Sequence, residues 1–284
     1  MELQGSLRRL HELPPLAPGT QRLLIVLADE DSELEDVAQA IEQIPALTAR
    51  VIGLACSAYF GGHKVRGVFD AIVRVLGLNL VRSLATAIAV GDAFDAQRCA
   101  PFKPERHWAA ALLTATFARL LAEGTVTEEP IQPEEAYLCG LLHNLGLLAM
   151  VHIAPRESGQ ALALIEHDSE HSLVEIETRL MGVHHRQVGA WLAFRWQLPP
   201  EVGIVMQHHC NPDYRGPSWA LSLLIGVATN WAQQHLAGVA APSVDGASLE
   251  ALGIDQTVLE ARAARCLASA DEVDELARLL ARPN

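Results

Sequence analysis

Aromatic residues are scarce in this sequence: they make up 5% of the 284 residues, whereas half of the residues are apolar. Ala and Leu dominate the apolar set and favour helices, while the β-branched and aromatic residues that favour strands are comparatively sparse. No segment alternates apolar and polar residues over the length of a strand. The sequence therefore predicts an all-α fold.

Closely spaced cysteines and long apolar runs are also missing. The five cysteines lie far apart and form no CxxC pair, so we expect reduced thiols and no disulfide framework. The sequence contains no uninterrupted apolar run of about 18 residues, which argues against a membrane span. Its first residues contain no apolar segment typical of a secretion signal. We therefore expect a cytoplasmic protein that does not associate with membranes.

Positive charge is in short supply. The chain has 21 Lys and Arg residues against 34 Asp and Glu residues, which gives a net charge of −13. Such a surface repels a phosphate backbone, so we expect no nucleic-acid partner. Several basic residues in the first hundred positions leave a small nucleotide as an open ligand, although scattered surface residues explain them equally well: Arg50, Lys64, Arg66, Arg74 and Arg82.

The apolar residues recur at helical spacing, and Pro and Gly residues punctuate them. Pro45 predicts the start of a helix that ends at Gly61. We also expect a helix beginning near Asp31-Ser32, a single helix from residue 133 to residue 155, and two amphipathic helices in the last forty residues. A loop containing Pro101 and Pro104 is the expected boundary between two lobes.

The most informative stretch is Ala136–Val151, an almost continuous apolar run interrupted by His143 and Asn144. The apolar flanks predict that this polar pair is buried. A buried polar group without a partner costs a few kcal/mol, so the two side chains must be hydrogen-bonded or bind something. The first alternative is a structural polar contact between helices, and the second is a metal or ligand site.

Histidine is abundant, with 12 residues, and several lie in groups. Imidazole is a common ligand of transition metals, so His143 together with the pairs His184-His185 and His208-His209 could form a metal site. Adjacent residues on a helix point about 100° apart, however, so both members of a pair rarely reach one ion. Hydrogen-bonded core or surface histidines remain the alternative explanation.

Several segments resemble, in order and spacing, the HDOD domain, a relative of the HD-type metal-dependent phosphohydrolases. They are LPPL, PALTARVIGLACSAYFGG, FDAIVRVLG, AYLCGLLHNLGLLAM, GVHHRQVGAWLAFRWQLP and VMQHH. The resemblance covers residues 13–237. It implies a two-lobed helical fold, with an N-terminal lobe over 13–100 and an HD-like lobe over 105–237. We expect helices in 247–282 to pack on this domain. It also implies a bacterial, cytoplasmic protein of signal transduction.

The resemblance further implies where the metal ligands of active HD proteins would lie. A first histidine is expected after Trp108, where the chain continues with three alanines, although His107 lies about one turn away. The His-Asp doublet corresponds to His143-Asn144, and a late aspartate is expected near residues 228–230, where Asn230 is an amide. The remaining candidates for a residual metal or ligand pocket are His143, Asn144, His185, His208 and His209.

A hydrolytic divalent-metal site needs anionic ligands, and this chain has amides in their place. We therefore expect no catalytic residues and no cofactor beyond weak binding of a divalent metal. The preferred hypothesis is a non-enzymatic regulatory module that acts through contacts with a protein partner. The alternatives are a metal-dependent phosphohydrolase of a nucleotide or cyclic dinucleotide, and a sensor with a small-ligand pocket between the lobes.

Overall fold

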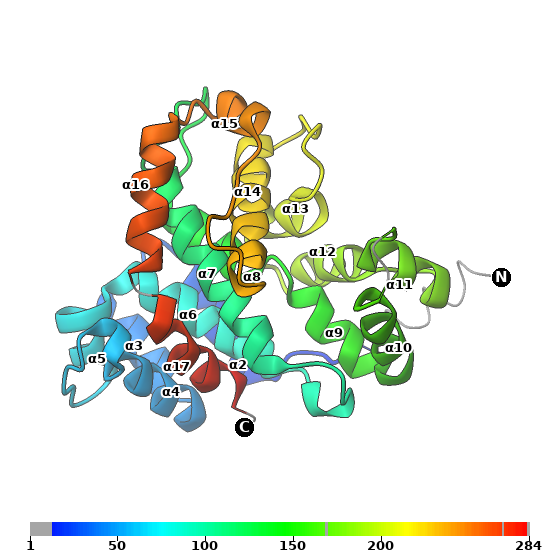
Figure 1. Ribbon diagram of the computed structural model, residues 1–284. Helices are drawn as coiled ribbons and strands as arrows, with labels where there is room; N and C mark the ends of the chain where they lie inside the picture. The colour runs from blue at the N-terminus through cyan, green and yellow to red at the C-terminus, as the bar shows by residue number, and fades with distance from the viewer. Residues whose placement is uncertain (1–12, 168–169, 269, 283–284) are drawn as a thin grey trace.

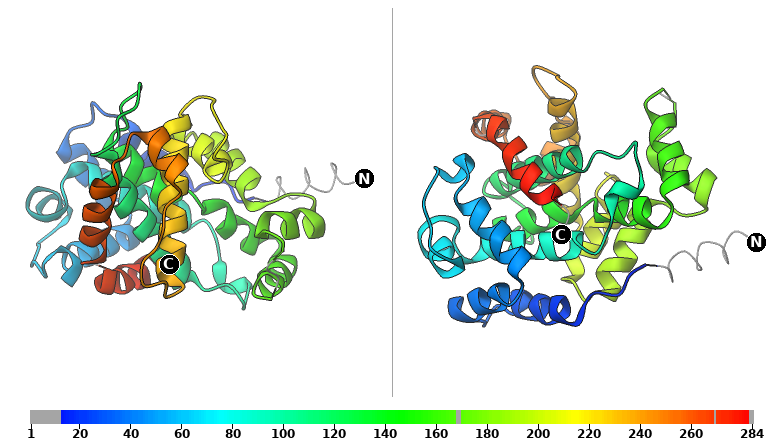
Figure 2. Two further views of the ribbon diagram at one scale, coloured as in Figure 1. Left: turned by 45° about the horizontal axis from the view of Figure 1, so that its top comes forward. Right: turned by 90° about the horizontal axis from the view of Figure 1, so that it is seen from below.

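Every regular element in the described part of the chain is a helix. The computed structural model describes residues 13–167, 170–268 and 270–282, and it contains no strand in these ranges (Figure 1). The prediction of an all-α fold is therefore confirmed. Two groups of helices, joined by a loop around residues 99–103, form two lobes (Figure 2).

The N-terminal lobe is built from short helices. Pro18 and Pro45 each occupy the first position of a helix, as predicted for Pro45. The second helix begins later than expected, because Glu33 and Asp36 form a capping box in which the Glu33 amide donates to the Asp36 carboxylate over 3.3 Å. The elements are α2 (Pro18–Ala28), α3 (Leu34–Glu42), α4 (Pro45–Ala55), η1 (Ala58–Phe60), α5 (Val68–Ala71), η2 (Ile72–Leu76) and α6 (Leu78–Gly91).

The second lobe surrounds one long central helix, α7. It follows the short turn η3 (Ala96–Arg98), and its neighbours α8 and α14 lie along it. Phe117 on α7 stacks on Trp231 of α14 with the ring centroids 4.2 Å apart, and both side chains are buried. The elements are α7 (Pro104–Ala122), α8 (Pro133–Leu142), α9 (Leu145–Ile153), α10 (Pro155–Ile165), α11 (Leu173–Met181), α12 (His185–Arg195), α13 (Pro200–His208) and α14 (Trp219–Leu236).

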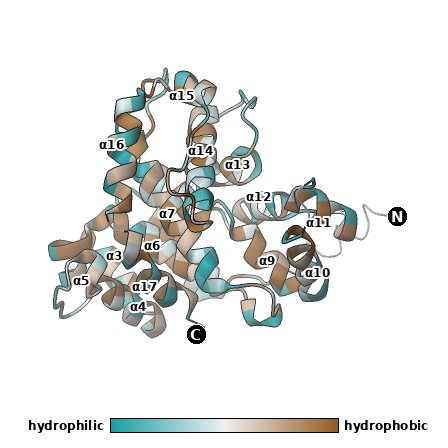
Figure 3. Cartoon of the chain, viewed as in Figure 1, coloured by the Kyte–Doolittle hydropathy of each residue, from teal (hydrophilic) through white to brown (hydrophobic). Residues whose placement is uncertain are grey.

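The predicted single helix over residues 133–155 is wrong. The chain turns at His143 and Asn144, so that α8 ends at Leu142 and α9 begins at Leu145. The described part of the chain contains one stretch, Pro133–Ile153, whose length and composition would allow it to cross a membrane, and 78% of its apolar window is buried inside the protein. The apolar side chains on both sides of the turn therefore form core, and Figure 3 shows the hydrophobic colouring of α9.

The C-terminal segment folds as three helices where two were expected. Asp245 and Asp255 each accept hydrogen bonds from backbone amides at the start of a helix, and Gly253, with a φ of 63°, separates the first two. The helices are α15 (Gly246–Leu252), α16 (Gln256–Leu267) and α17 (Ala270–Ala281). Helix α17 packs on both α7 and α4, so it contacts both lobes.

Candidate functional site: a cluster of imidazoles

His143 lies at the C-terminal end of α8, with 3% of its surface exposed. Its Nδ1 lies 2.7 Å from the carbonyl oxygen of Gly140, which fixes the ring against its own helix and leaves Nε2 directed away from that bond. Gly140 allows α8 to cross α7 closely, since a Cβ there would lie 2.7 Å from the Cα of Ala115. The contact between these helices therefore determines where the imidazole lies.

His209 lies beside His143 and is oriented in the same way. It is 5% exposed, and its Nδ1 lies 2.8 Å from the carbonyl oxygen of Val205 on α13. The rings of His143 and His209 meet edge to face, with their centroids 5.2 Å apart. Gly226 on α14 makes this arrangement possible, because a Cβ at that position would lie 1.9 Å from the carbonyl oxygen of His209. Helices α8, α13 and α14 thus meet at the two rings.

His185 begins α12 and forms an ion pair or hydrogen bond with a buried carboxylate. Glu177 on α11 is 1% exposed, and its Oε2 lies 2.6 Å from Nδ1 of His185 and accepts from the His185 backbone amide over 2.9 Å. Helix α9 packs against this turn through Gly146, where a Cβ would lie 1.9 Å from the His185 carbonyl oxygen and 2.6 Å from the Gly189 nitrogen. No larger residue fits there without a shift of the backbone.

A fourth imidazole belongs to the cluster. His107 lies near the start of α7, and its pKa is lowered to about 3, first by burial and then by the nearby His143 and His185. Sequence comparison placed the first HD-type position after Trp108 and treated His107 as one turn out of register. The structure places His107 within electrostatic reach of these two imidazoles.

Two of the candidate residues do not join the rings. His208 stacks face to face on Tyr214, with the centroids 3.9 Å apart, and so turns away from its neighbour His209. The Asn144 carbonyl oxygen is buried and has no hydrogen-bond partner among the described residues. Asn230 is exposed, while the adjacent Thr229 is buried and its hydroxyl lacks a partner in the described part of the chain.

Burial and nearby positive charge favour the neutral form of His143 and His209. Burial is the main cause that lowers the pKa of His143 to about 4, and the nearby His185 and Arg186 lower it further. The pKa of His209 is also well below its usual value, owing to burial, His143 and Arg186. No carboxylate of the described residues counteracts either shift. Arg186 therefore supplies a positive charge beside the imidazoles, and no motif in the sequence had pointed to it.

The donor set does not fit the metal that HD-type relatives use. With Nδ1 engaged in three of the rings, Nε2 is the remaining donor atom, which is how metal-binding histidines are commonly oriented. Within residues 13–167, 170–268 and 270–282, however, no group of three or more His, Cys, Asp or Glu side chains has the spacing to hold an ion. The guanidinium of Arg186 also opposes a divalent cation at this place.

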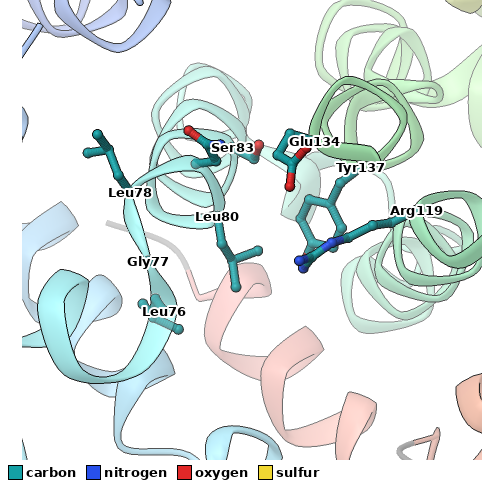
Figure 4. Close-up of a pocket in the computed structure, with 9 residues that line it drawn as sticks. Leu76, Gly77, Leu78, Leu80, Ser83, Arg119, Glu134 and Tyr137 are labelled. Atoms are coloured by element: carbon teal, nitrogen blue, oxygen red, sulfur yellow. The ribbon is translucent and has the colours of Figure 1, made fainter. Parts of the chain in front are cut away.

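Two cavities among the described residues lie away from the cluster. One pocket of about 250 Å³ and a larger groove of about 750 Å³ adjoin each other where α6 meets α8 (Figure 4). None of the clustered histidines lines either of them. His143, His185 and His209 are buried in the packed interior, and these two cavities lie at the junction of the lobes.

The fold and this arrangement define a class: an all-α, two-lobed protein whose second lobe is HD-like. A family model of the HDOD domain matches residues 13–212, and the chain belongs to this family. The match ends before α14, so the predicted extent of 13–237 and the separation of 247–282 stay predictions.

Solved structures agree with this assignment. The chain is 27% identical to a "Putative signal transduction protein" of Marinobacter aquaeolei VT8, with a TM-score of 0.83 over 95% of this chain and 60% of that one. It is 26% identical to a "Putative phosphohydrolase" of Shewanella amazonensis SB2B, with a TM-score of 0.78 over 97% of this chain and 98% of the other.

A further relative comes from Treponema pallidum (strain Nichols). It is an uncharacterised protein that is 29% identical over 211 residues, which are 72% of this chain and 39% of the relative. The chain thus spans about two fifths of the length of the curated relative that it matches, and 60% of the Marinobacter chain.

Proposed function

We propose that this HDOD protein is a non-enzymatic regulatory module of bacterial signal transduction that acts through contacts with a protein partner. One observation carries the proposal: burial lowers the pKa of His143 and His209, the guanidinium of Arg186 lowers both further, and no described carboxylate is among the groups that act on them. The structural neighbour from Marinobacter aquaeolei VT8, which is named as a signal transduction protein, is consistent with this role.

The same residues argue against hydrolysis. A metal-dependent phosphohydrolase must hold a divalent ion and lower the pKa of the water bound to it, which requires negative charge around the ion. Here Asn144 supplies a neutral amide, and the buried carboxylate of Glu177 is already engaged by the ring and the backbone amide of His185. The cluster lacks the charge for that chemistry.

The competing function is a metal-dependent phosphohydrolase of a nucleotide or cyclic dinucleotide. The neighbour from Shewanella amazonensis SB2B carries the name of a phosphohydrolase, and the free Nε2 atoms of three imidazoles are suitable donors for a transition metal. This alternative requires the rings to move together around an ion, because their present spacing does not hold one.

Elemental analysis combined with an activity assay separates the two functions. The protein is purified without chelators, incubated with Mn²⁺, Fe²⁺ or Zn²⁺, desalted, and tested with bis(p-nitrophenyl) phosphate and with cyclic dinucleotides. We expect substoichiometric metal and no turnover above that of the free ions. A stoichiometric metal with turnover that His143→Ala abolishes and His63→Ala retains would contradict the proposal. His63 is a suitable control because its side chain is exposed.

A second variant calibrates the assay. Asn144→Asp restores the acidic residue of the His-Asp doublet, and the added negative charge should raise the amount of retained metal relative to the wild type. If the variant retains metal and the wild type does not, the amide explains the difference. Equal retention of about one metal per chain by both proteins would show that the amide has no such effect.

A further inference from the structure

The pocket of about 250 Å³ lies at the junction of the two lobes. The first lobe contributes the start of α6, with Gly77, Leu78, Asn79 and Leu80, and the second contributes Arg119 of α7 and two residues of α8. Figure 4 shows the labelled side chains of Leu78, Leu80 and Arg119 around one space, together with those of α8. Anything bound in it would contact both lobes at once.

The start of α6 offers unpaired hydrogen-bond donors to this pocket. Gly77 is the N-cap and provides no side chain, and the backbone amides of Leu78, Asn79 and Leu80 form no hydrogen bond with another described residue. The first intrahelical bond runs from the Val81 amide to the Gly77 carbonyl over 3.2 Å. Free amides at the positive end of a 14-residue helix favour an anionic group.

Two hydroxyls of largely buried residues open toward the same pocket. Tyr137 and Ser83 are each 6% exposed, neither hydroxyl is hydrogen-bonded to a described residue, and neither oxygen is among the fully buried atoms. Both side chains lie at the pocket in Figure 4. Polar groups on residues this deeply buried are normally satisfied, so two hydroxyls that open toward one cavity offer their hydrogen bonds to a ligand bound there. This observation is independent of the helix terminus.

The pocket also contains two opposite charges that are not paired with each other. Arg119 and Glu134 both line it, and within the described residues neither forms an ion pair or a hydrogen bond. In Figure 4 the Arg119 side chain extends beside the Tyr137 ring, while Glu134 lies near Ser83. A ligand that carries both charges would compensate each side chain without bringing the two together.

We propose that this pocket binds a small zwitterion whose carboxylate lies at Arg119 and the α6 terminus and whose ammonium group lies at Glu134. The side chains of Leu76, Leu78 and Leu80 give the pocket an apolar wall for an aliphatic part. An aliphatic α-amino acid has this combination of groups. The assignment does not depend on the imidazole cluster, because none of its rings lines the pocket.

The test uses three probes that differ by one charged group: L-leucine, 4-methylpentanoate, which lacks the ammonium group, and 3-methylbutylamine, which lacks the carboxylate. Binding to the full chain is measured by isothermal titration calorimetry. We expect L-leucine to bind and each of the other two to bind about tenfold more weakly or worse, since a hydrogen bond to a charged group contributes about 1.5–3 kcal/mol.

Charge variants then locate the two ends of the ligand. Arg119→Gln should weaken L-leucine and 4-methylpentanoate alike, whereas Glu134→Gln should weaken L-leucine and leave 4-methylpentanoate unchanged or tighter. Arg22→Gln and Glu128→Gln remove the same charges at exposed positions outside the pocket and should change neither affinity. Tyr137→Phe keeps the ring packing and removes only the hydroxyl, so it tests the pocket even if another variant folds poorly.

Three results would overturn the proposal. The first is a folded wild-type chain that does not bind L-leucine at millimolar concentration. The second is binding that the Arg119 and Tyr137 variants leave unchanged, which would place the ligand elsewhere. The third is equally tight binding of 4-methylpentanoate and L-leucine, which would make the pocket an anion site and remove the role assigned to Glu134.

Discussion

The imidazole cluster and the pocket between the lobes differ in how their polar groups are satisfied. In the cluster, the Nδ1 atoms of His143, His185 and His209 each contact a carbonyl or carboxylate oxygen, and glycines bring the surrounding backbones so close that no methyl group fits. In the pocket, charged and hydroxyl groups remain open toward a cavity. On this comparison we propose that the HD-like centre stabilises the fold and that a ligand would bind at the junction of the lobes.

Replacing Gly146 by Ala should have the largest effect of the changes considered. The added Cβ would lie 1.9 Å from the carbonyl oxygen of His185, a backbone atom that cannot rotate away. Overpacking typically costs 1–3 kcal/mol, and a backbone clash this short should cost about 3 kcal/mol or more. Denaturant unfolding monitored by circular dichroism measures the loss.

Gly19→Ala is the matched control for this substitution. Gly19 lies in the first turn of α2, and a Cβ there would meet no heavy atom within 4 Å. Alanine also favours a helix over glycine, so the free energy of unfolding should stay the same or rise by about 0.5 kcal/mol. Equal losses of stability from the two substitutions would mean that α9 and α12 are not tightly packed. The cluster would then not differ from the pocket in its packing at this contact.

Glu177→Gln should have the next largest effect. The carboxylate is 1% exposed and contacts both the ring and the backbone amide of His185. The substitution replaces this buried carboxylate with a neutral amide at both contacts. We expect a loss of about 2 kcal/mol, in the range for hydrogen bonds to charged groups. The measurement is again the free energy of unfolding.

Glu166→Gln removes the same charge at an exposed position at the end of α10 and should change the stability by less than about 0.5 kcal/mol. A variant at Glu177 that is as stable as this control would indicate that the His185 contact contributes nothing to folding. The cluster would then resemble the pocket, and the structural role assigned to it would be wrong.

The pH dependence of stability tests the neutral state of the rings. The pKa of His143 falls from about 6.5 in the unfolded chain to about 4 in the folded protein, so the unfolded state binds the proton first as the pH decreases. Its contribution is therefore constant above about pH 6.5, and stability is lost between about pH 6.5 and pH 4. At pH 5 the loss from this residue is about 2 kcal/mol.

His143→Gln should reduce the pH dependence across this range, whereas His63→Gln, at an exposed position, should not change it. The free energy of unfolding is measured in urea at several pH values between roughly 4.5 and 7.5, because stability should fall within this range. If wild type and His143→Gln lose stability in parallel as the pH falls, His143 is not held neutral by burial in the folded state.

Much of the fold was accessible from the sequence because helical periodicity and the punctuation by Pro and Gly are local signals. They predicted an all-α protein and the start of α4 at Pro45, and both are confirmed. The same signals predicted one helix through His143, because a continuous apolar run carries no indication of a turn that other helices stabilise. The turn at His143 and Asn144 depends on tertiary contacts with α7 and α13, which no local pattern encodes.

The candidate site was only partly predictable for a related reason. The structure brings His185 and His209 together with the His143 of the doublet, and whether they form a functional site stays a prediction. His209 joins the cluster and His208 does not, because the two side chains point in different directions from their helix. The spacing of residues in the sequence could not show which of the two would join. His107 was recognised but displaced by one turn, and Arg186 was missed because no motif distinguishes an arginine that faces the rings from one that faces solvent.

The smallest effect on stability should come from substitutions in the pocket. Arg119→Gln and Ser83→Ala remove groups that form no hydrogen bond with a described residue, so each should change the free energy of unfolding by less than about 0.5 kcal/mol without ligand. Paired measurements with Glu177→Gln provide the contrast, because Glu177 and Arg119 are both charged groups of the second lobe and differ in whether the protein itself satisfies them. A loss of about 2 kcal/mol at Arg119 would show that this side chain stabilises the fold, and the contrast between a structural cluster and an open pocket would disappear.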